Sequence, residues 1–159
     1  IGQIETAGPM VMRGYFDNAE ATQETIGPDG WMKTGDLGYL TAEGNLAVAG
    51  GRLRDMIIRG GENIYPVEVE NLLRAHPGVT DIAVFGMPDD YYGEIVAAAV
   101  DGGDGLAPDA LGRFCDGRIA RFKVPARWFR VESFPLTASG KIRKTELREM
   151  AASGALDAL

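Results

Sequence analysis

An aspartate placed between glycines is the first residue of this chain whose setting suggests chemistry. Asp36 lies in the stretch GWMKTGDLG, at the end of an apolar segment. Its carboxylate can accept two hydrogen bonds from a vicinal diol, and a ribose presents such a diol. The alternative is an aspartate that only caps a turn through its own backbone. The spacing alone favours the turn cap.

A charged run followed by two glycines is the second candidate. In GRLRDMIIRGGENIYP, Arg52 can hold a phosphate or a ribose oxygen with its forked guanidinium. Gly60 and Gly61 predict a turn whose backbone adopts positive φ and approaches a ligand closely. Two alternatives stay open, which are a surface hairpin between domains and a pairing of Arg52 and Arg54 with nearby carboxylates.

A lysine after Ser-Gly is the third candidate. Lys141 lies in PLTASGKIRK, where a flexible loop would make it a mobile point charge able to enter a neighbouring site. A P-loop is excluded, because the motif G-x-x-x-x-G-K-[ST] lacks its first glycine and its final Ser/Thr here. An ordinary surface lysine remains the alternative.

Composition limits the classes of function. The chain has 159 residues and a formal net charge of −7, which argues against a general nucleic-acid binder. Cys115 is the only cysteine and His76 the only histidine, so an internal disulfide, a multi-thiolate metal site and an imidazole cluster are excluded. No run of about 18 apolar residues and no signal peptide occurs, so we expect no transmembrane segment and a cytoplasmic location.

The first part of the chain predicts an antiparallel meander that belongs to a small barrel. Its expected strands are residues 3–6, 9–13, 31–36, 38–40 and 46–49, with turns at 28–30 and 43–45. Residues 19–25 predict a short helix with Asn18 as its N-cap. The chain does not open on methionine, and its first residues are typical of the middle of a strand. We therefore expect a fragment.

After Arg54 the pattern changes to strands that alternate with helices. The expected strands are residues 56–58, 79–86, 94–100 and 127–131, and the expected helices are 66–75, 108–119 and 145–152. Pro66 suits the first turn of its helix. This alternation predicts a compact α+β domain of roughly 100 residues, large enough for its own core.

Taken together and in this order, the three stretches resemble the motifs of the adenylate-forming (ANL) superfamily, which includes acyl-CoA synthetases, peptide-synthetase adenylation domains and beetle luciferases. The resemblance runs from about residue 14 to residue 148. It implies that residues 1–53 are the β-rich end of a large N-terminal AMP-binding domain. Residues 54–159 would be the small C-terminal α+β domain, with a hinge at Arg54, where the family more often has Asp or Lys.

The resemblance also implies roles for the candidate residues. Asp36 would bind the ribose hydroxyls of ATP and of the acyl-adenylate, and Arg52 would contact the same nucleotide. Lys141 would bridge the acyl carboxylate and the α-phosphate during adenylation. Gly60 and Gly61 would line the path of the pantetheine arm of CoA. Residues near the CoA nucleotide would be Tyr92, Phe122 and Lys123.

The stretch GGENIYPVEVE resembles CoA ligases, whereas peptide-synthetase domains carry an Arg/Glu-rich version. The implied function is an ATP-dependent acid–thiol ligase that makes acyl-AMP and then acyl-CoA, with a fatty acid as the expected substrate. ATP, CoA and Mg would be its cofactors, with Mg held mainly by the absent N-terminal domain. The alternatives are an adenylation domain that loads a carrier protein and a non-catalytic accessory module. A homodimer and a regulatory acetyltransferase acting on Lys141 are compatible with the resemblance.

Overall fold

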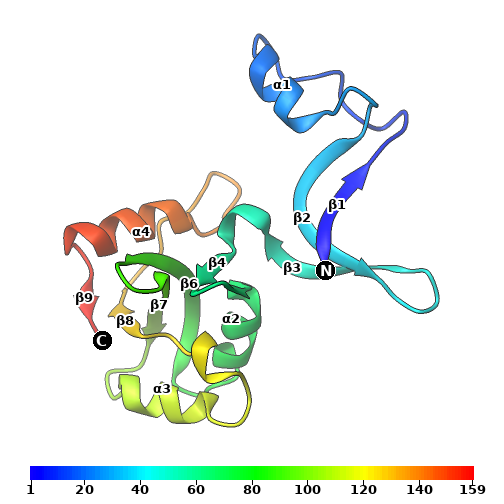
Figure 1. The fold of residues 1–159 in the computed structure, drawn as a ribbon. Helices are drawn as coiled ribbons and strands as arrows, with labels where there is room; N and C mark the ends of the chain where they lie inside the picture. The colour runs from blue at the N-terminus through cyan, green and yellow to red at the C-terminus, as the bar shows by residue number, and fades with distance from the viewer. The chain divides into compact units, whose positions relative to one another are not determined.

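The computed structural model describes residues 1–159, except for the burial of Gly50. It divides into two compact units, Ile1–Arg54 and Asp55–Leu159 (Figure 1). We expected the second domain to begin at Arg54, and the structure assigns Arg54 to the first unit. No helix among the described residues is long and apolar enough to cross a membrane.

The first unit is built on a three-stranded antiparallel sheet of order β1-β2-β3. Its elements are β1 (Gly2–Thr6), α1 (Ala19–Thr25), β2 (Met32–Leu40) and β3 (Leu46–Arg52). The N-cap predicted for α1 is confirmed, since the Asn18 side chain accepts a hydrogen bond from the Ala21 amide at 3.0 Å. This contact satisfies one of the free amides at the helix start.

Three sequence-based expectations for this unit differ from the structure. Residues 9–13 form no strand, because Gly8 adopts a φ of +129° and accepts the Val11 amide in a turn. The two segments expected around Gly38 form one strand, β2. Gly38 permits this because a Cβ there would lie 2.7 Å from the Ala47 carbonyl oxygen on β3. The strands form an open sheet and close no barrel among the described residues.

The first unit has almost no core of its own. Leu37 is its one buried hydrophobic residue among those that the structure describes, and the other buried apolar residues lie in the second unit. Large apolar side chains are instead exposed, including Met10 at 96% and Phe16 at 100%. A sheet of this kind needs further protein to cover it, because an isolated small sheet buries too little apolar surface to be stable.

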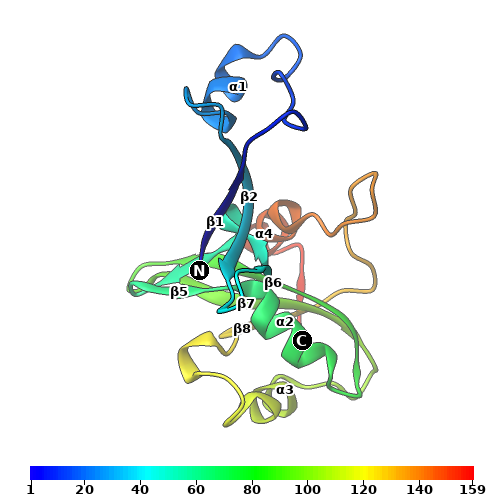
Figure 2. The same ribbon diagram turned by 90° about the vertical axis from the view of Figure 1, so that its right-hand side faces the viewer.

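The second unit contains a six-stranded sheet with helices on both faces (Figure 2). After the 3₁₀ turn η1 (Leu53–Asp55), its elements are β4 (Ile57–Arg59), β5 (Glu62–Ile64), α2 (Pro66–Arg74), β6 (Val79–Asp89), β7 (Gly93–Gly102), α3 (Pro108–Cys115), η2 (Arg121–Lys123), β8 (Arg127–Arg130), α4 (Lys144–Ser153) and β9 (Asp157–Ala158). The strand β7 is central. It pairs with β6 along one edge, and with β4 and the parallel strand β8 along the other.

Side chains alternate across β7 and fill two cores. Val96, Ala98 and Val100 pack with α2 and α3 on one face. Ala97 and Ala99 pack with α4 on the other. A strand covered on both faces has a continuous apolar sequence, as residues 95–100 do. The predicted α+β fold class is confirmed.

The boundaries of the helices follow local chemistry. The helix α2 begins at Pro66 and α3 begins at Pro108. Proline suits the first position of a helix, because an amide there would make no hydrogen bond within the helix. The helix expected over residues 108–119 ends at Cys115, because Gly117 adopts a φ of +69°. The strands β5 and β9 are too short to give a sequence pattern, and we did not expect them.

Candidate functional site

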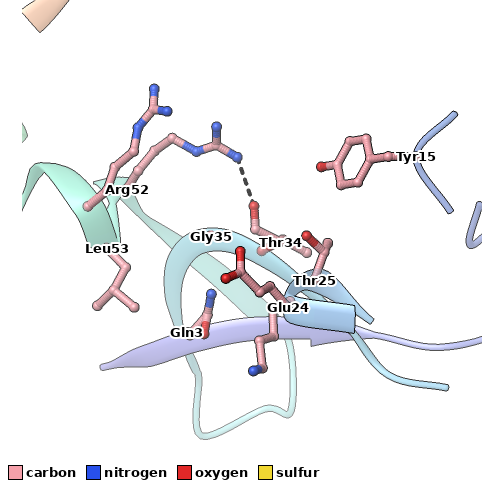
Figure 3. Close-up of a pocket in the computed structure, with 10 residues that line it drawn as sticks. Gln3, Tyr15, Glu24, Thr25, Thr34, Gly35, Arg52 and Leu53 are labelled. Carbon is pink, nitrogen blue, oxygen red and sulfur yellow. Dashed lines mark hydrogen bonds between the residues drawn. The ribbon is translucent and has the colours of Figure 1, made fainter. Parts of the chain in front are cut away.

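A pocket of about 400 Å³ lies in the first unit (Figure 3). Its lining includes Thr34 and Gly35 of β2, Arg52 at the end of β3, and Arg54 in the turn that follows. Tyr15, Glu24 and Thr25 complete its other side from the α1 region. The pocket therefore combines cationic and hydroxyl groups, a set that suits a phosphorylated or hydroxylated ligand.

Asp36 and Arg52 are brought together by the sheet. They are direct partners in the register of β2 and β3, and Arg52 Nε donates to Asp36 Oδ1 at 3.1 Å. Arg52 Nη2 also donates to the Thr34 carbonyl oxygen at 2.8 Å. Asp36 lies within a strand, so the turn-cap alternative is wrong. The proposed pairing of Arg52 with a nearby carboxylate is present.

This ion pair orients its members more than it stabilises the fold. The side chains of Arg52 and Asp36 are 46% and 49% exposed, and a pair so open to water contributes roughly 0–1 kcal/mol. Gly35 helps the guanidinium to lie against the backbone, because a Cβ there would be 3.4 Å from Arg52 Nη2 and its φ of +78° disfavours other residues. Both charged groups stay accessible to a ligand.

The predicted glycine turn joins β4 to β5. Gly60 and Gly61 have φ of +57° and +87°, so the expected positive φ is present at both. The Gly60 amide donates to the Tyr92 carbonyl oxygen at 2.8 Å, and a Cβ at Gly60 would lie 3.3 Å from the Tyr92 ring. A Cβ at Gly61 would meet nothing within 4 Å. A side chain at Gly60 would therefore press on the Tyr92 ring, whereas Gly61 borders open space.

Tyr92 packs beside this turn. The Arg59 guanidinium lies 3.8 Å from the centre of the Tyr92 ring, a cation–π contact. The loop that carries Tyr92 is fixed by Asp89, whose Oδ1 accepts the amides of Tyr91 and Tyr92 at 3.0 and 2.8 Å. One part of the ring is therefore already occupied by a cation, and 38% of the residue is exposed.

Phe122 and Lys123 lie in η2 and are partly engaged by the protein. Lys123 Nζ lies 2.7 Å from both carboxylate oxygens of Glu68 on α2. Phe122 packs against the core that lies between the sheet and the helices α2 and α3. A phosphate that binds Lys123 would have to share the ammonium with Glu68.

Lys141 lies at the end of a hydrogen-bonded turn in the loop that precedes α4. The Thr137 amide donates to the Lys141 carbonyl oxygen at 2.8 Å, and the Lys141 amide donates to Thr137 Oγ1 at 3.0 Å. Gly140 allows the turn with a φ of +78°. The Lys141 side chain is exposed, and its ammonium has no ion pair among the residues that the structure describes.

Cys115 is not a candidate nucleophile. Its thiol is buried in α3, and burial raises its pKa, with the nearby Asp116 charge acting in the same direction. Only the thiolate is strongly nucleophilic. The role of Cys115 is to fill the core.

Sequence reasoning missed several polar residues that contact the candidates, and two further residues that form an ion pair in the second unit. They are Thr34, Arg59, Glu68, Glu70, Asp89 and Lys144. One signal was available for Glu70, which lies on the apolar face of α2, four residues after Pro66 and three before Leu73. A carboxylate on such a face needs a buried partner.

The fold and these motif residues define the class of the protein. Residues 68–141 match the family described as the AMP-binding enzyme C-terminal domain. The chain belongs to the adenylate-forming superfamily and corresponds to the C-terminal portion of its members, as the motifs predict.

Individual relatives agree with this placement. The chain is 47% identical, over 150 residues that cover 93% of it and 27% of the relative, to the putative acyl-CoA synthetase YngI of Bacillus subtilis. It superposes with a TM-score of 0.85 on o-succinylbenzoate CoA synthetase (MenE) from Bacillus subtilis in complex with the acyl-adenylate intermediate OSB-AMP, at 40% identity over 92% of this chain and 30% of that one. ATP-bound MatB from Rhodopseudomonas palustris gives a TM-score of 0.85 at 37% identity, over 94% of this chain and 30% of that one. The chain thus spans less than a third of these relatives' length.

Proposed function

We propose that this chain is the C-terminal part of an ATP-dependent carboxylic acid–CoA ligase that forms acyl-AMP, releases pyrophosphate, and then forms acyl-CoA. The observation that carries the proposal is Lys141, an exposed lysine without an ion pair among the described residues, held on a hydrogen-bonded turn. A surface cation that is not neutralised in a chain of net charge −7 is available to an anionic ligand.

The nearly coreless first unit supports the proposed domain arrangement. Its apolar residues are exposed, and the relatives extend over more than three times the length that they share with this chain. In our proposal, residues 1–53 complete a large N-terminal domain, which covers Met10 and Phe16. The small domain that moves is residues 54–159, which are the second unit together with Arg54 as its hinge.

In the first half-reaction, an oxygen of the substrate carboxylate attacks the α-phosphorus of ATP, and the bond to the pyrophosphate oxygen breaks. Asp36 accepts hydrogen bonds from the ribose hydroxyls, and Arg52, which Asp36 and Thr34 orient, contacts the same nucleotide. Lys141 places its ammonium between the acyl carboxylate and the α-phosphate. Negative charge accumulates there during the transfer, and a fixed cation in a site with little water stabilises it.

In the second half-reaction, the CoA sulfur attacks the acyl carbonyl, and AMP leaves with the electrons of the broken C–O bond. We propose that the small domain first turns about Arg54, which withdraws Lys141 and brings the glycine turn to the pantetheine arm. Gly61 is the better candidate for that contact, because a Cβ there would meet nothing within 4 Å, whereas a Cβ at Gly60 would lie 3.3 Å from the Tyr92 ring.

The CoA nucleotide would contact the surface of the small domain at Tyr92, Phe122 and Lys123. The cation–π contact from Arg59 and the ion pair from Glu68 already hold two of these residues. We therefore expect CoA to add contacts to existing ones, with Lys123 shared between Glu68 and a phosphate.

No group of three or more His, Cys, Asp or Glu side chains that could hold a metal ion lies together among the described residues. In our proposal, Mg accompanies ATP and is held by the phosphates and mainly by residues of the N-terminal domain.

We further propose that the carboxylic acid substrate is a fatty acid. The test is pyrophosphate release by the full-length protein with ATP, CoA and a panel of fatty, aryl and short-chain acids. Release that depends on one acid class, with acyl-CoA as the product, supports the ligase. Release without thioester formation on CoA, but with transfer to a carrier protein, would overturn the assignment of CoA as acceptor.

Replacement of Asp36 by alanine tests the nucleotide contact. Asp36→Ala should raise the KM for ATP by roughly 10-fold, because a hydrogen-bonded charged acceptor for the ribose is lost. It also releases Arg52 from one of its two partners. Initial rates at varied ATP measure the effect, with Glu43→Ala as the control, since Glu43 lies in an exposed turn. An unchanged KM would remove Asp36 from the nucleotide site.

A side chain at Gly61 tests the pantetheine path. Asparagine tolerates the φ of +87° better than other residues do, so Gly61→Asn should leave the fold intact. We expect adenylate formation to persist and thioester formation to fall by roughly 10-fold, because a misplacement of even about 1 Å at a reacting group costs up to 10²-fold. Stopped-flow measurement of each half-reaction checks this. Equal rates in both variant and parent would exclude Gly61 from the path.

A further inference from the structure

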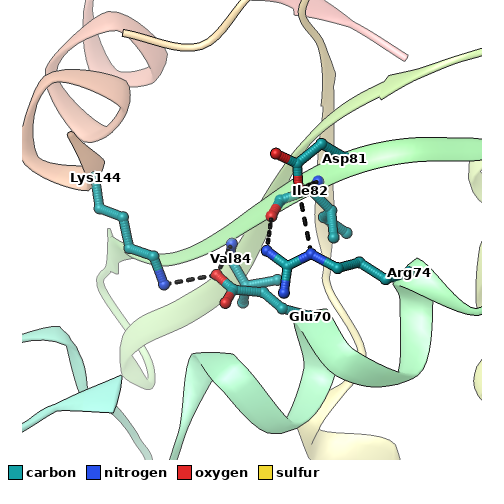
Figure 4. A network of polar contacts seen from close by, with 6 residues as sticks. All are labelled: Glu70, Arg74, Asp81, Ile82, Val84 and Lys144. Atoms are coloured by element: carbon teal, nitrogen blue, oxygen red, sulfur yellow. Dashed lines mark hydrogen bonds and ion pairs between the residues drawn. The ribbon is translucent and has the colours of Figure 1, made fainter. Parts of the chain in front are cut away.

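The one buried charged residue among those described is Glu70, on α2 (Figure 4). It is 6% exposed. Glu70 Oε1 accepts a hydrogen bond from the Val84 amide of β6 at 2.8 Å, and it lies 2.6 Å from Lys144 Nζ. A carboxylate taken out of water is unfavourable unless it is paired and hydrogen-bonded, so both contacts are needed to keep Glu70 in place.

Lys144, the partner of Glu70, lies on a helix that covers the other face of the sheet. Lys144 is the first residue of α4, whereas Glu70 belongs to α2, and these helices pack on opposite faces of the sheet. The Lys144 side chain is only 21% exposed. The ion pair therefore ties the start of α4 to α2 and β6.

The start of α4 is also the end of the turn that carries Lys141. The Arg143 amide donates to the Pro135 carbonyl oxygen at 2.8 Å, and Leu136 and Ile142 form an isolated β-bridge. Within this closed turn, the Thr137 and Lys141 hydrogen bonds fix the tip. Lys144 directly follows this turn, and its ion pair with Glu70 anchors the end of the turn to α2.

From this arrangement we propose that Glu70 and Lys144 are positioning residues for Lys141. Their ion pair fixes the C-terminal foot of the turn 135–143 and so sets where the Lys141 ammonium can lie. The proposal rests on the adenylation role proposed for Lys141, but its structural part can be tested without it.

A second ion pair in the same figure gives a matched control. Arg74 of α2 donates to Asp81 at 3.2 Å and to the Ile82 carbonyl oxygen at 3.1 Å. This pair ties α2 to β6 without contact to α4. Loss of Arg74 therefore removes another, more exposed link between α2 and β6 and involves no residue of the turn 135–143.

The experiment compares Glu70→Gln with Arg74→Gln in the full-length protein. Glutamine keeps an acceptor for the Val84 amide but removes the charge that holds Lys144. Hydrogen exchange, followed by mass spectrometry on peptides covering residues 135–143, should accelerate by roughly 10-fold in Glu70→Gln only, the change expected when one charge-assisted bond is lost from a local opening. The single variant Lys144→Arg, which keeps a positive charge opposite Glu70, should exchange as slowly as the parent.

The kinetic part separates positioning from general damage. In Glu70→Gln, kcat for pyrophosphate release, with ATP and the most active acid of the panel, should fall by roughly 10-fold, while the KM for ATP stays unchanged. Thioester formation from supplied acyl-AMP should also be unaffected. The double variant Glu70→Gln/Lys144→Met leaves no unpaired buried charge, and it should show the same fast exchange if a single variant fails to fold.

The outcomes are distinct. Exchange that is equal in Glu70→Gln, Arg74→Gln and the parent overturns the inference, whatever the kinetics. A different outcome would be fast exchange of the turn in Glu70→Gln combined with an unchanged adenylation rate in Lys141→Ala. It would support the role of Glu70 in positioning the turn and would reject the proposed role of Lys141 in adenylation. A fall in both half-reactions to the same extent, with slow exchange retained, would overturn the inference as well.

Discussion

Lys141→Ala should lower the rate of adenylate formation by roughly 10² or more and leave thioester formation from supplied acyl-AMP nearly normal. The magnitude is that of removing one preorganised charge partner from a transition state. The asymmetry follows because the lysine acts only while the α-phosphate carries extra charge. Acetylation of Lys141 should give the same result, since it removes the charge and most of the donors. Single-turnover assays of each half-reaction measure both effects.

Arg143 offers a matched control for Lys141. Its side chain is also basic and 55% exposed, it lies on the same turn, and it pairs with Glu146 of α4. Arg143→Ala should therefore keep both half-reactions. If Lys141→Ala slows the two steps equally, a melting curve decides whether the turn is damaged, and a normal curve would reject the proposed role. If neither step changes, Lys141 is an ordinary surface lysine.

Arg54→Pro should leave adenylate formation largely intact and slow thioester formation by roughly 10² or more. Arg54 lies in η1, at the boundary between the two units. Proline holds φ near −65°, which lies within the range of a 3₁₀ turn but prevents the larger change of backbone angles that a rotation requires. The catalytic groups would then be trapped in one pose, and misplacement of reacting groups by even about 1 Å costs up to 10²-fold.

Arg54→Ala separates the backbone from the side chain. It removes the guanidinium, which lines the pocket of the first unit, but leaves the backbone angles free. We expect both half-reactions to continue in this variant. Equal loss of the two steps in Arg54→Pro, or equal effects of proline and alanine, would count against a hinge at this residue.

Much of the fold follows from periodicity and from turn residues. The apolar run at residues 95–100, the prolines at the starts of α2 and α3, and Asn18 all have local causes, and each was predictable. The failures have local causes too. Residues 9–13 have an apolar composition but lack the geometry of a strand, since Gly8 turns the chain before Pro9. The end of α3 was placed too late because apolar spacing continues to Ile119 beyond the turn at Gly117.

The site was less predictable, because its partners are distant in sequence. The candidates Asp36, Arg52 and Lys141 were visible from their types and spacing. The register that places Asp36 opposite Arg52, and the link between Lys144 and Glu70, depend on tertiary packing that no local pattern encodes. Lys123 was assigned to phosphates on position alone, and its contact with Glu68, 55 residues away, was not visible.

The two filled faces of β7 have a mechanical consequence. Ala97, Ala98 and Ala99 are fully buried between the sheet and the helices on its two faces, and close-packed protein interiors hardly deform. The second unit should consequently move as a rigid body. A rotation of the backbone at Arg54 would displace its distant loops without changing the distances between them. A single rotation would then move Lys141 away from the active site and bring Gly61 into it. Neither movement could occur without the other.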